Sequence, residues 1–253
     1  MPKVQELARE LVDHATLYAL SARRISSLNT PQEWARVVRE ARSLYRTVDT
    51  TGEPGEMILY LLIESVLNAP QIVAKMELKT NPNMEVHGSD GIHFSWDADD
   101  GCADIYFGEA KLYDSVYSAM DAAFESIASF HQENLFSHEV LAITNNFKYV
   151  EQPLRDAVIR YISSNNSDDG CRVNHAILIG YNWDQVSGAS SVFRSVAEFR
   201  ALYRNERTRL QRLLQSRMDN FSLKYLRFEV FFLPFASVQD LRSEFLRILR
   251  GGL

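Results

Sequence analysis

The sequence predicts an α/β protein in which a mixed sheet is flanked by helices, and three observations lead to this prediction. Segments with a helical spacing of apolar residues alternate along the chain with segments of strand-like, two-residue alternation. Gly, Pro, Asn and Asp separate these segments. The order of elements is a helical region, then α-β-β-β-α-β, then further helices and strands, which fits helices packed on a sheet.

The composition is that of an ordinary globular chain. The 253 residues are 46% hydrophobic and 24% charged, enough for one sizeable core. No apolar run approaches about 18 residues, and the start, MPKVQELARELVDH, is amphipathic, so neither a membrane span nor a signal peptide is expected. Cys102 and Cys171 lack metal-ligand spacing, which predicts reduced thiols and a cytoplasmic location.

Residues 1–50 are expected to form a helical N-terminal lobe, with helices over 3–26 and 31–47. The second helix begins at NTPQEW, which combines an N-cap with Pro and Glu. After VDTTGEPGE, the run GEMILYLLIESVLNAP predicts a buried helix that ends at Asn68, before Pro70.

Residues 51–150 are expected to form the core of the fold, which starts with this buried helix. The core's further elements are strands over 71–79, 84–96 and 103–113, a helix over 114–134, and a strand over 137–145. Glycines are expected to bend the second strand around Asp90. The acidic DADDG at 97–101 lacks the spacing of a calcium loop and is interpreted as a hairpin turn.

Residues 151–253 are expected to be an α/β extension packed on the core. Its elements are a helix over 151–164, a strand over 173–183, an Arg-rich helix, a strand over 223–235 and a last helix. Residues 194–217 carry seven arginines against two glutamates. Three of them, Arg200, Arg204 and Arg207, share one helical face, which is a candidate surface for DNA or for a partner protein.

The segment GEAKLY carries the candidate chemistry. Glu109 and Lys111 project from the same face of a strand, because side chains two residues apart do so. An antiparallel hairpin would bring Asp90 opposite Glu109, with about 5 Å between the Cβ atoms. Two carboxylates that close repel each other, and Mg²⁺ relieves this because it prefers carboxylate oxygens.

The remaining parts of such a site follow from the chemistry of phosphate esters. The Lys111 ammonium would counter the negative charge that develops during attack on a phosphate. A third carboxylate is expected from the buried helix, where Glu56 and Glu64 are alternatives. The simplest other interpretation is a surface ion pair between Glu109 and Lys111, with Asp90 as a turn residue.

Asp90, followed after 18 intervening residues by Glu109-Ala110-Lys111 on an α-β-β-β-α-β core, resembles the PD-(D/E)XK nuclease superfamily. Within it, GEMILYLL, GSDGIHF and GEAKLY, in this order after a helical region, are similar to the HamA family. That family comprises the nuclease subunits of Hachiman anti-phage defence systems. The Pro of the superfamily's name is absent, and Ser89 stands in its place.

The resemblance implies a restriction-endonuclease-like core and Mg²⁺- or Mn²⁺-dependent hydrolysis of DNA. It implies that the metal ligands are Asp90, Glu109, the Ala110 carbonyl and the helix glutamate. Lys111 would position or activate water. The family's helix glutamate often follows a glycine, which favours Glu56 over Glu64.

The resemblance also implies a partner, a HamB-like helicase subunit that restrains the nuclease and delivers DNA. Two alternatives remain open at this point. The first alternative is a non-catalytic binding or scaffold subunit that keeps the nuclease fold. The second is a stand-alone restriction or repair nuclease.

Overall fold

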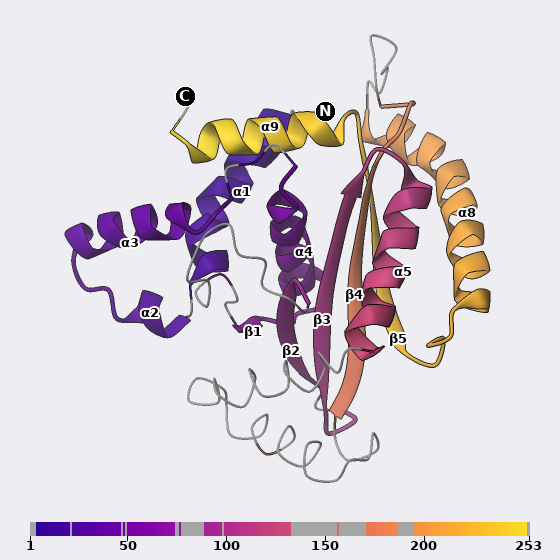
Figure 1. Ribbon diagram of the computed structural model, residues 1–253, viewed down its shortest axis with the longest axis horizontal. Coiled ribbons are helices and arrows are strands. Elements are labelled where there is room, and N and C mark those ends of the chain that lie inside the picture. Colours follow the sequence, from indigo (N-terminus) through magenta and orange to yellow (C-terminus); the bar gives the residue numbers. More distant parts are fainter. Residues whose placement is uncertain are drawn as a thin grey trace.

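The computed structural model describes residues 4–20, 22–46, 48, 50–73, 76, 89–97, 99–132, 156, 171–186 and 195–251. The described helices are α1 (Val4–Ala19), α2 (Ala22–Ser26), α3 (Pro31–Ser43), α4 (Glu53–Val66), α5 (Val116–Gln132), α8 (Val196–Asn220) and α9 (Val238–Leu249) (Figure 1). The described strands are β1 (Gln71–Val73), β2 (Gly91–Asp97), β3 (Cys102–Tyr113), β4 (Cys171–Asn182) and β5 (Arg227–Phe235).

The strands form one mixed sheet, as the sequence predicts. Its order is β1-β2-β3-β4-β5. The pairs β1–β2 and β2–β3 are antiparallel, whereas β3–β4 and β4–β5 are parallel. The antiparallel half is therefore built around a local hairpin, and the parallel half requires long crossover connections.

Helices cover both faces of the sheet (Figure 1). Helices α1, α4 and α9 share a core with Ala176 and Leu178 of β4. Helices α5 and α8 share a second core with Ile177 and Ile179 of the same strand. Because successive side chains of a strand point to opposite faces, β4 is apolar on both sides, as a central strand must be.

Helix α4 lies close against β3, and a glycine makes this approach possible. A Cβ atom on Gly55 would lie 2.9 Å from Cγ of Leu112 and 3.5 Å from Cβ of Ala110. Only a residue without a side chain fits this distance without displacing β3. Glu56 is the next residue of the same helix.

Two predicted elements differ from the observed ones. The helix predicted over 3–26 is broken after Ala19 into α1 and α2. The break lets Ile25 pack against the same core as Leu20. The strand predicted over 71–79 is wrong at Met76, which lies in a 3-10 turn and is buried in that core.

Other boundaries shift or fall outside the described chain. Of the strand predicted over 84–96, residues 84–88 lie outside the described residues, and β2 begins at Gly91, so Asp90 lies directly before it. The strand predicted over 137–145 lies outside the described residues, as does the helix predicted over 151–164 apart from Asp156. Within the described segments, no helix is both long and apolar enough to cross a membrane.

Gly180 of β4 generates a test of this packing. A Cβ atom there would lie 2.2 Å from Cδ2 of Leu112 and 3.1 Å from Cε2 of Phe235. We expect Gly180→Ala to lower the free energy of unfolding by about 1–3 kcal/mol, because the core has no room for the methyl group. Urea denaturation monitored by circular dichroism measures this loss.

The control is a double-mutant cycle with Leu112→Ala. Removing the Leu112 side chain removes the closest clash, so Gly180→Ala costs less in that background. An equal cost in both backgrounds would show that the packing argument is wrong.

Candidate functional site

The hairpin of β2 and β3 brings Asp90 to Glu109, as the sequence predicts. Gly91 pairs with Gly108 in the antiparallel register, so the preceding residue of one strand faces the following residue of the other. The Asp90 amide continues the ladder by donating to the Gly108 carbonyl at 2.8 Å. Gly101, with a φ of 63°, lies in the turn that connects the two strands.

The Asp90 side chain is fixed by the main chain of β3. Its Oδ2 atom accepts a hydrogen bond from the Ala110 amide at 2.6 Å. Asp90 is half-buried, and Ser89 before it is buried. The carboxylate is therefore held at one position, directly beside the strand segment that carries Glu109 and Lys111.

Glu109 and Lys111 share one face of β3 and form an ion pair, with Nζ 2.5 Å from Oε1. Ser126 of α5 lies close enough to Glu109 to favour its charged form and so to lower its pKa. Burial, and after it the Asp90 carboxylate, raise the pKa of Glu109, Lys111 opposes the shift, and the net pKa is about 7. Burial lowers the pKa of Lys111, but Glu109 and Asp90 outweigh this effect and the net shift is upward.

The two candidate helix glutamates occupy different surroundings. The Tyr18 hydroxyl donates to Oε2 of Glu56 at 2.9 Å and lies 3.5 Å from the Asp90 carbonyl oxygen. Glu64 instead accepts a hydrogen bond from the Gln71 amide at 3.1 Å, at the start of β1. The Tyr18 hydroxyl thus links Glu56, and not Glu64, to the main chain of Asp90.

Tyr18 was missed by sequence reasoning. It lies 72 residues before Asp90, and its only signal is a polar-tipped side chain on the buried face of the first helix, among Leu11, Val12 and Ala15. Burial raises the pKa of Tyr18 well above its usual value, and the negative charges of Glu56 and Asp90 add to this effect. The hydroxyl therefore remains a hydrogen-bond donor.

The chemical type of these donors suits a divalent cation such as Mg²⁺ or Mn²⁺, but among the described residues the carboxylates of Asp90, Glu109 and Glu56 do not all lie within 4.8 Å of one another. The set consists of hard oxygen atoms, from Asp90, Glu109 and Glu56, together with the Ala110 carbonyl next to Glu109. Burial and the nearby Asp90 carboxylate disfavour the charged form of Glu109, and one lysine does not offset them. A cation bound between the carboxylates would relieve this repulsion.

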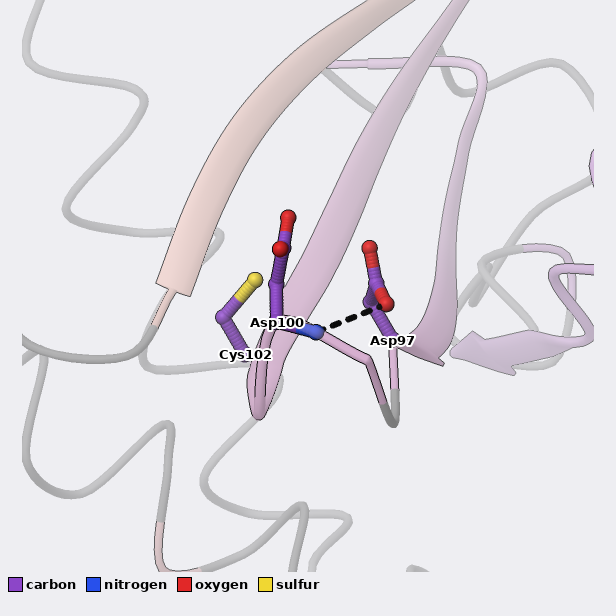
Figure 2. A group of neighbouring side chains, drawn as sticks. All are labelled: Asp97, Asp100 and Cys102. Atoms are coloured by element: carbon purple, nitrogen blue, oxygen red, sulfur yellow. Dashed lines mark hydrogen bonds between the residues drawn. The ribbon is translucent and has the colours of Figure 1, made fainter.

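A second acidic cluster lies at the turn between β2 and β3, where Asp97, Asp100 and Cys102 approach one another (Figure 2). The Asp100 amide donates to the Asp97 carboxylate at 3.1 Å, which closes the turn. Arg172 of β4 donates to Asp97 and Asp100, at 2.7 Å in both cases, and to Asp104. The Arg172 hydrogen bond lowers the pKa of Asp97.

The guanidinium already supplies the cation at this turn. The interpretation of DADDG as a hairpin turn is confirmed. Sequence reasoning did not find Arg172 because it reaches the turn only through the parallel pairing of β3 with β4.

The arginines of α8 differ in their surroundings, and Arg212 is exposed to solvent like the three predicted ones. Arg200, Arg204 and Arg207 are exposed to solvent. Arg209 instead pairs with Glu206 of its own helix, and Arg217 pairs with Asp121 of α5. Arg200, Arg204 and Arg207, which we call the arginine ridge, do not lie with the Asp90 and Glu109 carboxylates: they are on α8, which α5 separates from β3 (Figure 1).

The mixed five-stranded sheet with helices on both faces defines an α/β protein consistent with a restriction-endonuclease-like core. The chain belongs to the HamA family, whose model matches residues 1–249. This membership makes it a protein of the Hachiman type of antiviral defence. Neither a curated protein nor a solved structure gives a significant match.

The raised pKa of Glu109 generates a pH-dependent prediction for the protein in EDTA. In this state the folded protein binds the Glu109 proton more tightly than the unfolded chain, so stability falls as the pH rises from about 4.5 to about 7. Glu109→Gln removes this loss. We therefore expect the variant to gain on the order of 2 kcal/mol relative to the wild type across this range.

Thermal denaturation at a series of pH values measures the difference. Glu125→Gln, at an exposed position of α5, controls for the loss of one carboxylate. If the difference in melting temperature between wild type and Glu109→Gln were the same at every pH, the raised pKa of the buried Glu109 carboxyl would be contradicted.

Proposed function

We propose that the protein is a metal-dependent DNA nuclease that acts as the effector subunit of a Hachiman-type defence complex. The observation that carries the proposal is the juxtaposition of Asp90, Glu109 and Lys111 on the β2–β3 hairpin. Asp90 is tied to the Ala110 amide at 2.6 Å, and Lys111 lies 2.5 Å from Glu109. Membership of the HamA family supports the same reading.

Each residue has a distinct role in this proposal. Asp90, Glu109, Glu56 and the Ala110 carbonyl hold a Mg²⁺ or Mn²⁺ ion. When bound, the ion supplies Lewis-acid stabilisation to the phosphate oxygens. Lys111 donates hydrogen bonds from its ammonium group and orients the attacking water or the phosphate.

The reaction is hydrolysis of a phosphodiester. A P–O bond forms to water, one P–O ester bond breaks, and the leaving oxygen takes up a proton. The short segment of β3 thus carries both the anionic side chain for the cation and the cationic side chain for the substrate. Their spacing of two residues places both on one strand face.

A helicase subunit of the HamB kind is the proposed partner. The chain carries a net charge of -6, which disfavours tight binding to DNA by the chain alone. The sequence also lacks a GxxxxGK[ST] phosphate-binding loop, so a motor activity has to come from another protein. A nuclease without sequence readout endangers the host genome, and a partner that restrains it removes this danger.

The first test is cleavage of supercoiled plasmid by the purified chain, alone and with the neighbouring helicase and ATP. We expect nicking or degradation that requires Mg²⁺ or Mn²⁺ and stops in EDTA. Glu109→Gln and Lys111→Ala are expected to lower the rate at least about 100-fold, because the first removes a charged ligand of the metal ion and the second removes the positive charge that stabilises the reacting phosphate. Asp99→Asn, at an exposed position of the β2–β3 turn, is the matched control and should retain activity.

The outcomes separate the proposal from its alternatives. Cleavage that needs no partner would identify a stand-alone nuclease. No cleavage with the helicase, DNA, ATP and Mg²⁺ all present would identify a non-catalytic subunit.

We further propose that the arginine ridge of α8 contacts the phosphates of DNA or an acidic surface of the partner. The three arginines project into solvent from about two turns of one helix. Replacing Arg200, Arg204 and Arg207 by Gln is expected to weaken DNA binding and to reduce the slope of log K against log salt by up to about 3. Fluorescence anisotropy at several salt concentrations measures both effects.

The matched control is Arg247→Gln, an arginine of α9 that pairs with Glu244. An unchanged salt slope in the triple variant would exclude contact with DNA phosphates. Loss of co-purification with the helicase in that variant would then assign the ridge to the partner.

A further inference from the structure

Tyr18 places its hydroxyl between two parts of the candidate site. It belongs to α1, and its side chain is 3% exposed. The hydroxyl donates to Oε2 of Glu56 at 2.9 Å, and the Asp90 carbonyl oxygen lies 3.5 Å away. Helix α1 therefore reaches the site from outside the α-β-β-β-α-β core.

The ring of Tyr18 is fixed by other aromatic rings. It meets Tyr60 edge-on, with 5.4 Å between the ring centroids, and packs against Tyr45 at 6.5 Å. These contacts restrict the torsion that would move the hydroxyl. A buried phenol also needs a hydrogen-bond partner, so the Glu56 carboxylate and the hydroxyl hold each other in place.

We infer that Tyr18 is a positioning residue that orients the Glu56 carboxylate towards the divalent cation. This inference rests on the proposed metal site. The hydrogen bond fixes one oxygen of Glu56, and a fixed carboxylate loses less freedom when it binds an ion. Because α1 also packs on α4, which carries Glu56, the hydroxyl and the carboxylate belong to elements that are in direct contact.

The experiment is calorimetric titration of the full chain with Mn²⁺ in the absence of DNA. Tyr18→Phe keeps the ring and its packing but removes the hydroxyl. We expect the variant to bind Mn²⁺ about 10-fold more weakly than the wild type. In cleavage assays, the half-maximal Mn²⁺ concentration should rise while the rate at saturating Mn²⁺ stays within a few-fold.

Tyr45→Phe is the matched control. Tyr45 is equally buried in the same cluster of rings, but its hydroxyl donates to the Ala15 carbonyl at 2.8 Å and not to the site. We expect Tyr45→Phe to lower the melting temperature and to leave the affinity for Mn²⁺ unchanged. A Glu56→Gln background supplies a second check, since Tyr18→Phe should have little further effect there.

The outcomes distinguish this inference from the proposal on which it rests. Wild-type affinity in Tyr18→Phe, or equal weakening by Tyr45→Phe, would overturn the positioning role and leave the metal site standing. If the wild type binds no Mn²⁺, the metal site itself fails. The inference is supported if Tyr18→Phe, but not Tyr45→Phe, weakens the binding of Mn²⁺ and if this effect is absent in the Glu56→Gln background.

Discussion

The hydrogen bond from the Ala110 amide to the Asp90 carboxylate is the interaction on which the arrangement of the candidate site depends. It ties the residue before β2 to the C-terminal half of β3. Ala110 stands between Glu109 and Lys111, so the bond holds the Asp90 carboxylate beside the segment that carries both side chains. The approach of α4 at Gly55 is matched to this segment, because Ala110 and Leu112 form the surface against which the helix packs.

The fixed position of Asp90 beside Glu109 has an electrostatic cost, because two carboxylates lie close together and one of them is buried. The Glu109 carboxylate is 6% exposed and close to a second carboxylate, which favours its protonated form. Such a cost is tolerated only where the surrounding packing is strong enough to impose it. Here the packing comes from β4, the strand next to β3. The side chains of β4 from Ala176 to Ile179 are buried between two layers of helices.

The sequence predicts the local parts of this site and misses the distant ones. The two-residue alternation from Ala103 to Tyr113 predicts the strand and the shared face of Glu109 and Lys111, and the hairpin predicts their approach to Asp90. Tyr18 and Arg172 could not be found in this way, because they arrive through helix packing and parallel pairing. The alternation over 71–79 was misleading at Met76, which the core takes up; residues 74, 75 and 77–79 of that prediction lie outside the described chain.

The two acidic clusters of the hairpin show why a count of acidic residues does not identify a metal site. At the turn, the planar guanidinium of Arg172 bonds three carboxylates, of which Asp100 is exposed and Asp97 half-buried, and the pKa of Asp97 is lowered. At the other end, the ammonium of Lys111 bonds Glu109 in a buried setting, and the pKa of Glu109 is raised. An arginine that satisfies its carboxylates leaves no demand for a further cation. The carboxylates of Asp90 and Glu109 differ, because Glu109 is deeply buried and Lys111 is its single counter-ion. We therefore place the metal at this end of the hairpin.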